Sequence, residues 1–165
     1  MFNLIKTRRS IRKFTSKAIE DEQLNQIIEA GTWAPSGLNN QPWKIAIIKD
    51  PDTQETLASL TRYSAIIEGA PVLIAVFLDI DLSYDRTKDI QAIGAFIQNI
   101  LLAIHALGLG GVWLGEILKS KDKVSKVLNA PKNLELMAVI ALGHPAEEGV
   151  KKSRKSVEEV VFLRR

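Results

Sequence analysis

The chain of 165 residues contains no cysteine, which excludes several classes of protein at once. Disulfide-stabilised domains, iron–sulfur proteins and enzymes with a cysteine nucleophile all need thiols. Histidine is also scarce, because His105 and His144 are the only two and their spacing is not that of a metal site. Neither histidine has a neighbouring cue for a Ser-His hydrolase, and Ser36 lacks the G-x-S-x-G elbow. We therefore expect no metal site and no catalytic side chain of these kinds.

Long uncharged hydrophobic segments are scarce as well, and the one that exists spans residues 90–107. It is long enough to raise the question of a membrane span, but four polar residues interrupt it: Gln91, Gln98, Asn99 and His105. We expect a central helix buried by protein and no membrane partner. The first residues lack the charged start and apolar run of a signal peptide, so we expect a cytoplasmic location.

The composition is that of an ordinary globular protein, with 46% hydrophobic and 25% charged residues. This length suits one domain, residues 1–165. The net charge is only +3, yet basic residues cluster at 6–13 and 151–155. Such clusters suit a phosphate-bearing partner, either a small cofactor or a nucleic acid backbone. No helix-turn-helix, RNP-like or zinc-finger pattern is present, so we do not expect nucleic acid.

The most unusual stretch is the polar segment 34–43, which reads A-P-S-G-L-N-N-Q-P-W. Pro35 and Pro42 restrict the backbone near its two ends, and Gly37 permits a positive φ. Four hydrogen-bonding side chains lie between the prolines: Ser36, Asn39, Asn40 and Gln41. Amides and hydroxyls at this density suit the polar edge of a planar ring better than a metal or a phosphate.

A glycine-rich segment at 108–111, G-L-G-G, follows a predicted helix and opens a predicted strand. A dinucleotide-binding fingerprint has the reverse order, so it does not explain these glycines. They are either a helix stop or a place where backbone approaches a flat ligand. Trp113 lies just beyond them, and Trp33 and Trp43 flank the polar segment. Core packing is the ordinary role of each tryptophan, but their positions favour a planar aromatic ligand nearby.

The hydrophobic pattern predicts alternating helices and strands. Helices are expected at 2–7, about 21–33, 52 to just before Gly69, 90–107 and 121–129. Strands are expected at 43–49, 72–78, 112–115 and 134–142. Residues 79–88 form a polar, turn-like connection. This order predicts an α+β or α/β domain with a mixed sheet covered by helices. The apolar terminal segment 157–163 needs a neighbour to cover it, which makes a dimer plausible.

Taken together, these segments resemble the FMN-dependent nitroreductase family. Residues 8–12, R-R-S-I-R, resemble its N-terminal motif R-[RH]-S-x-[RK]. Residues 35–43 resemble its P-S-x-x-N-x-Q-P-W loop, which is the most specific match. The segment 108–115 resembles the family's glycine-rich exit from the long helix, and 152–154, K-S-R, its late basic motif. The resemblance covers nearly the whole chain.

The resemblance implies an α+β fold with a mixed, mainly antiparallel sheet flanked by helices, in an intertwined homodimer with FMN at the interface. The FMN phosphate would be held by Arg8, Ser10, Lys152 and Arg154. Arg9 would lie nearby, and Arg12 would approach the ribityl or pyrimidine side. The other subunit would contribute Pro35, Ser36, Gly37, Asn39 and Gln41, and the far edge of the ring would meet Leu114 and Gly115. The family's usual asparagine is absent around Tyr63, and many relatives carry an acid at the position of Gly115.

The same resemblance implies an oxidoreductase in which FMN accepts a hydride from NADH or NADPH and then reduces a small aromatic acceptor in a ping-pong sequence. The acceptors would be nitroaromatics, quinones or flavins. Two alternatives stay open at this point. One is a flavin-dependent dehalogenase of the same superfamily, for which the sequence offers no long lid insertion. The other is a flavin- or nucleotide-binding module without turnover.

Overall fold

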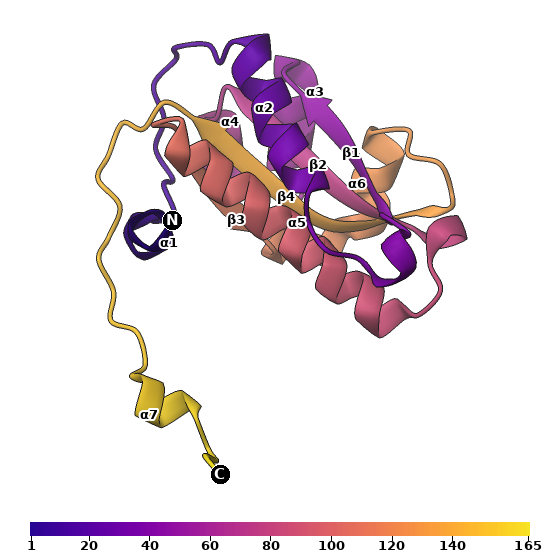
Figure 1. Ribbon diagram of the computed structural model, residues 1–165. Coiled ribbons are helices and arrows are strands. Elements are labelled where there is room, and N and C mark those ends of the chain that lie inside the picture. The colour runs from indigo at the N-terminus through magenta and orange to yellow at the C-terminus, as the bar shows by residue number, and fades with distance from the viewer.

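A four-stranded sheet lies at the centre of the structure, a computed structural model that describes residues 1–165 (Figure 1). Its strands are β1 (Trp43–Ile48), β2 (Val72–Asp79), β3 (Gly110–Leu114) and β4 (Leu134–Gly143). They pair in the order β1-β2-β4-β3, and every pair is antiparallel. The predicted α+β fold with a mainly antiparallel sheet is confirmed, and parallel pairing is limited to an isolated bridge between Ser10 and Gly111.

The inner strand β2 is buried along its whole length because helices cover both faces of the sheet. Side chains alternate along a strand, so Ile74 and its even-numbered neighbours face one layer and Phe77 and its odd-numbered neighbours face the other. The first layer contains α2 (Asp21–Thr32) and α5 (Arg86–Ala106). The second contains α3 (Pro51–Ala58), α4 (Ser64–Glu68), the 3-10 turn η3 (Glu116–Ser120) and α6 (Lys121–Val127).

The long helix α5 is the buried core helix that the sequence predicts. By length and composition alone it could cross a membrane, yet its apolar residues pack against the sheet and α2. Phe96 stacks on Trp43 of β1, with 5.1 Å between the ring centroids. The helix begins at Arg86, four residues earlier than predicted, because the Asp85 side chain accepts a hydrogen bond from Lys88 N and caps the first turn. At the other end, Gly108 adopts φ 72°, as expected of a glycine that stops a helix.

The prediction of one helix from residue 52 to Gly69 is wrong. The structure has two short helices, α3 and α4, separated by a turn at residues 59–63. Side chains of η3 bind this turn: Ser120 Oγ donates to the carbonyl of Leu60 at 2.9 Å, and Thr61 Oγ1 donates to Glu116 at 2.6 Å. Because these partners lie 55 or more residues away in the sequence, local helix signals could not predict the break.

Both ends of the chain lie away from the sheet (Figure 1). The N-terminal helix α1 (Phe2–Thr7) buries none of its residues, and the short α7 (Val157–Val160) lies in a fully exposed C-terminal segment. Several large apolar side chains in these ends are exposed, including Phe2 and Phe162, the latter 98% exposed. These surfaces have no partner within the single chain.

Candidate functional site

The segment after α1 runs past the start of β3, which brings the N-terminal basic residues next to the C-terminal ones. Ser10 pairs with Gly111 in the isolated parallel bridge, and Ile11 N donates to the carbonyl of Gly111 at 3.1 Å. The C-terminal segment lies alongside, since Arg12 N donates to Glu147 Oε1 at 2.8 Å. Two clusters that are about 140 residues apart in the sequence therefore form one site.

The cationic cavity between these segments has a volume of about 250 Å³. Seven residues line it: Arg8, Arg9, Ser10, Arg12, Val150, Lys152 and Arg154. The four residues predicted to hold a phosphate therefore line one cavity, and Arg9 and Arg12 line it with them. No acidic side chain lines the cavity.

The positive charge of the cationic cavity is not balanced by the protein. None of its cations takes part in an ion pair within 4.0 Å. Burial lowers the pKa of Arg8, and repulsion from Arg154 and Arg9 lowers it further. Arg9 donates through Nη1 to the carbonyls of Lys6 and Arg8, both at 2.7 Å, while its buried Nε has no partner. An arrangement of this kind favours a bound anion such as phosphate.

A second cavity, called here the ring-edge cavity, has a volume of about 310 Å³. Its lining is Arg12, Arg62, Tyr63, Ile66, Val112, Trp113, Leu114, Gly115 and Glu116. It contains the predicted Leu114 and Gly115. Arg12 lines both this cavity and the cationic one, so the two adjoin.

Of the three tryptophans, only Trp113 meets the expectation of a place beside this candidate site. Trp43 is buried in the core, and Trp33 is 80% exposed.

Sequence reasoning missed three polar or aromatic residues of the ring-edge cavity: Arg62, Tyr63 and Glu116. The only local signal was the charged and hydroxyl-bearing turn T-R-Y within an otherwise helical pattern. Its meaning depends on Glu116, which the fold brings from β3's far end. That contact leaves no trace in the local sequence.

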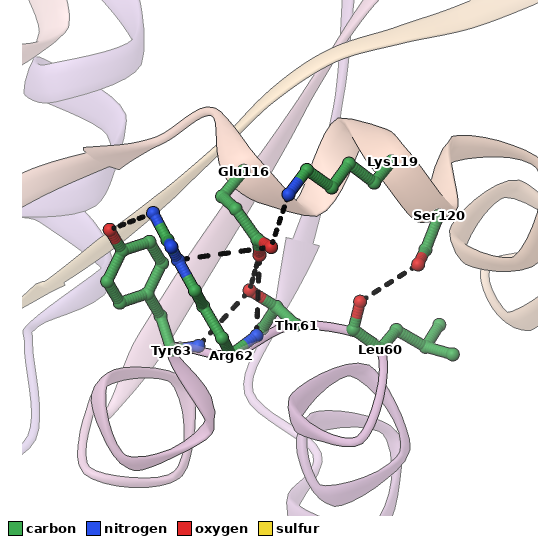
Figure 2. A network of polar contacts seen from close by, with 7 residues as sticks. All are labelled: Leu60, Thr61, Arg62, Tyr63, Glu116, Lys119 and Ser120. Carbon is green, nitrogen blue, oxygen red and sulfur yellow. Dashed lines mark hydrogen bonds and ion pairs between the residues drawn. The ribbon is translucent and has the colours of Figure 1, made fainter.

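Glu116 connects the turn at 59–63 to η3 (Figure 2). Its Oε2 accepts from Thr61 Oγ1 at 2.6 Å and from Arg62 N at 3.3 Å, and its Oε1 lies 3.4 Å from Lys119 Nζ. The Thr61 hydrogen bond lowers the pKa of Glu116 most, and the Arg62 N–H and Lys119 add to this effect against the opposing effect of burial. Glu116 is therefore ionised at neutral pH and is no proton donor there.

The polar segment 34–43 lies elsewhere in the chain. Pro35, Ser36 and Gly37 line a third cavity of about 320 Å³. Its other lining residues are Tyr84, which precedes α5, and Lys88, Gln91, Ala92 and Ala95 along the first half of that helix. Asn39 and Gln41 are exposed beside it. A 21-residue helix is about 30 Å long, whereas the cationic cavity lies beyond the other end of α5. One chain alone does not bring the polar segment to the arginines.

The backbone of the polar segment adopts left-handed conformations, but not at its glycine. Leu38, Asn39 and Gln41 have φ of 53°, 55° and 46°, whereas Gly37, which permits a positive φ, does not adopt one. Gly37 is needed for space, because a Cβ there would collide with the hydroxyl of Tyr84. Three non-glycine residues with positive φ in four positions cost free energy, and such clusters occur at binding sites.

The buried carboxylate of Asp89 holds the polar segment in place. Asn40 Nδ2 donates to Asp89 Oδ1 at 2.8 Å and to the carbonyl of Leu82 at 3.0 Å. On the other oxygen, Asp89 accepts from Ser83 Oγ at 2.7 Å and from the N–H groups of Tyr84 and Asp85. Asn40 is thus an anchor of the segment, and the connection 79–88 is ordered around the first turn of α5.

Comparison with known families decides what this arrangement belongs to. The family model described as "Nitroreductase family" matches residues 5–63 and 52–144, which together cover most of the chain. The chain belongs to the nitroreductase family. A relative from Methanothermobacter thermautotrophicus, described as a candidate NADH dehydrogenase/NAD(P)H nitroreductase, is 35% identical over 146 residues, covering 87% of this chain and 76% of the relative.

Two solved structures are similar along nearly the whole chain. A Desulfovibrio desulfuricans protein described as a candidate nitroreductase, in complex with FMN, is 46% identical with a TM-score of 0.94, covering 99% of this chain and 96% of that one. The NADPH:FMN oxidoreductase of Vibrio harveyi, complexed with NAD+, is 30% identical with a TM-score of 0.91, covering 99% of this chain and 76% of that one.

The role of Asp89 in this nitroreductase fold predicts a loss of stability on substitution. Asp89→Ala leaves the donors of Asn40 and Ser83 without their buried acceptor, so the free energy of unfolding should fall by about 3 kcal/mol. Chemical denaturation monitored by circular dichroism measures this. Asp81→Ala is the matched control, since Asp81 is exposed and its carboxylate accepts no hydrogen bond, and its effect should stay within about 0.5 kcal/mol.

The same pair of variants should differ in pH dependence. Burial raises the pKa of Asp89, but hydrogen bonds from Ser83, Asn40 and backbone N–H groups outweigh burial and hold the pKa below its usual range. A folded-state pKa below the unfolded one stabilises the protein above the usual aspartate pKa, and this stabilisation is lost as the pH falls through the folded value. The stability gap between wild type and Asp89→Ala should narrow below about pH 4. A gap that widens on acidification contradicts the assignment.

Proposed function

We propose that this chain is an FMN-dependent oxidoreductase that takes a hydride from NADH or NADPH and passes it to a small aromatic acceptor. The observation that carries the proposal is the position of Arg12, which lines both the cationic cavity and the ring-edge cavity. The two cavities share Arg12, and one is cationic while the other is lined partly by aromatic residues and by the strand end at Leu114 and Gly115. A mononucleotide with a planar ring matches that pattern.

The residues present fit FMN. Its phosphate would be held by Arg8, Arg9, Ser10, Lys152 and Arg154, whose charge is otherwise unbalanced. Arg12 stands at the junction, where it would reach the ribityl chain or the pyrimidine side. Leu114 and Gly115 would present backbone groups to the ring, and a Cβ at Gly115 would meet no atom within 4 Å, so the surface there is open.

The relatives support the same chemistry. The Desulfovibrio desulfuricans protein is in complex with FMN, and the Vibrio harveyi protein is an NADPH:FMN oxidoreductase in complex with NAD+. FMN, when bound, supplies the capacity to accept and return a hydride. The part of this chain is to bind the phosphate, to orient the ring, and to stabilise negative charge at its edge with Arg12. Glu116 is ionised, because its pKa is lowered, so we do not assign it the role of proton donor.

We propose a ping-pong sequence, in which one open face of the bound ring would receive NAD(P)H and the acceptor in turn. We propose nitroaromatics, quinones or free flavins as acceptors, because a planar site open to solvent accepts planar molecules of several kinds. We propose a cytoplasmic location, which is compatible with a supply of NAD(P)H.

We further propose that the working unit is a homodimer. The polar segment lies at the far end of α5 from the cationic cavity, so a second copy would have to bring Pro35, Ser36, Gly37, Asn39 and Gln41 to the ring. Leu38 is 85% exposed in this segment, and Phe162 and Val160 are exposed in the C-terminal one. Apolar surfaces of this kind suit burial against a second copy of the chain.

The first test of function is anaerobic reduction of the bound flavin. Protein loaded with FMN and mixed with NADPH or NADH should lose its visible flavin absorbance within the mixing experiment, because the site brings the donor to the ring. Free FMN at the same concentration is the control. Protein that retains FMN but is bleached by neither donor is a binding module without turnover, and the enzyme proposal then fails.

The cationic cavity predicts a loss of FMN affinity when its charge is removed. Arg8→Ala and Arg154→Ala should each raise the Kd for FMN by about tenfold or more, since a charge-assisted hydrogen bond contributes about 1.5–3 kcal/mol. Quenching of FMN fluorescence on binding measures the Kd. Lys17→Ala removes an exposed cation that does not line the cavity and should leave the Kd unchanged. Unchanged affinity in both arginine variants removes the phosphate assignment.

The dimer proposal predicts that an acid in the exposed C-terminal segment shifts the chain toward monomer. Phe162→Glu places a charge where a partner surface should bury the ring, so sedimentation velocity should show a smaller species at micromolar concentration. Ile80→Glu also replaces a large apolar side chain with a carboxylate, at a half-exposed site of η2 (Ile80–Leu82), and should leave the sedimentation coefficient unchanged. A wild-type chain that sediments as a monomer at all concentrations contradicts the proposal.

A further inference from the structure

The turn at residues 59–63 places a second guanidinium on the ring-edge cavity. Arg62 and Arg12 both line it, although they lie 50 positions apart in the sequence. The Arg62 guanidinium lies over its neighbour Tyr63, with its carbon 5.0 Å from the ring centroid, and Nη2 donates to Tyr63 Oη at 3.1 Å (Figure 2). The side chain is 68% exposed, so it can meet a ligand in the cavity.

The position of Arg62 depends on the turn more than on its own ion pair. Arg62 Nε lies 4.0 Å from Glu116 Oε1, and exposed pairs at such distances contribute little. The backbone is fixed more firmly, because Glu116 accepts from Thr61 Oγ1 at 2.6 Å and from Arg62 N at 3.3 Å. Because the Glu116 carboxylate binds both Thr61 and Arg62, it fixes the position of the Arg62 backbone.

The charges around the ring-edge cavity leave a positive excess. Glu116 is the one acidic residue of the lining, and Lys119 Nζ lies 3.4 Å from its Oε1 without lining the cavity itself. The lining therefore carries two guanidinium groups, those of Arg12 and Arg62, against one carboxylate, which leaves a net positive charge at the cavity.

We propose that Arg62 is a second cationic residue at the ring edge, that it binds reduced FMN more tightly than oxidised FMN, and that Glu116 and Thr61 are its positioning residues. This inference rests on the proposed function. NAD(P)H leaves as NAD(P)+ after giving up a hydride, which is one proton and two electrons. The bound ring thereby gains one negative charge until a solvent proton follows or the acceptor takes the hydride away. A cation at the ring edge favours the form with the additional charge.

The decisive measurement is the two-electron midpoint potential of bound FMN, with separate Kd values for oxidised and for chemically reduced FMN. Arg62→Gln should lower the preference for reduced FMN about tenfold, which corresponds to a midpoint about 30 mV more negative. Arg62→Lys keeps the charge and should restore most of the preference. Equal weakening of both forms by Arg62→Gln, or an unchanged midpoint, overturns the proposal.

Lys119→Gln is the matched control, since it removes a cation that pairs with the Glu116 carboxylate but does not line the cavity. It should leave the midpoint within error of wild type. A shift as large as that of Arg62→Gln would mean that general surface charge sets the potential, and it would overturn the assignment.

Thr61→Val tests the positioning role, because it removes the 2.6 Å hydrogen bond to Glu116 without changing any charge. It should lower the preference for reduced FMN about threefold, and it should have no further effect in an Arg62→Gln background. An effect that simply adds in the double variant assigns Thr61 a separate role and overturns the positioning claim. Failure of wild-type protein to bind FMN at all would instead remove the proposed function, and the wild-type titration alone reveals it.

Discussion

The burial of β2 on both faces is the constraint from which the rest of the structure follows. Apolar side chains point to both faces of the sheet along Val72–Leu78, so each face needs a layer of helices to bury them. The long helix of the first layer is α5, whose 21 residues separate the polar segment at one end from the arginines beyond the other end. A fold built on this helix keeps the polar segment and the arginines apart within one chain, which is why we propose a second copy to complete the site.

The cationic cavity shows the opposite of what stability alone would favour. Arginines from both ends of the chain lie together without acidic partners, and burial and mutual repulsion lower the pKa of Arg8. Likewise, Leu38, Asn39 and Gln41 adopt conformations that glycine would adopt more readily. Such departures from local preference are expected where a ligand supplies the missing interactions. In contrast, the acid nearest the ring-edge cavity, Glu116, is fully bonded, which suits a residue that fixes geometry.

Much of the fold was predictable because its signals are local. The strands and α1, α2 and α6 lie within a few residues of their predicted bounds, since apolar periodicity and terminating residues act within one segment. The errors have long-range causes. The break between α3 and α4 depends on Glu116 and Ser120, and the role of Gly37 depends on Tyr84, which lies 47 positions later in the numbered sequence.

The sequence by itself determined which segments are candidates for the site: the basic motifs at 8–12 and 152–154, the polar segment at 35–43 and the strand end at Leu114 and Gly115 are all visible in the order of residues. Only the tertiary structure decided which of them meet. The antiparallel sheet and the pairing of Ser10 with Gly111 bring the two basic motifs to one cavity, and the length of α5 holds the polar segment away from it. Likewise, only packing brings Arg62 and Arg12 to the same cavity, because both positions depend on contacts between segments that are distant in the sequence.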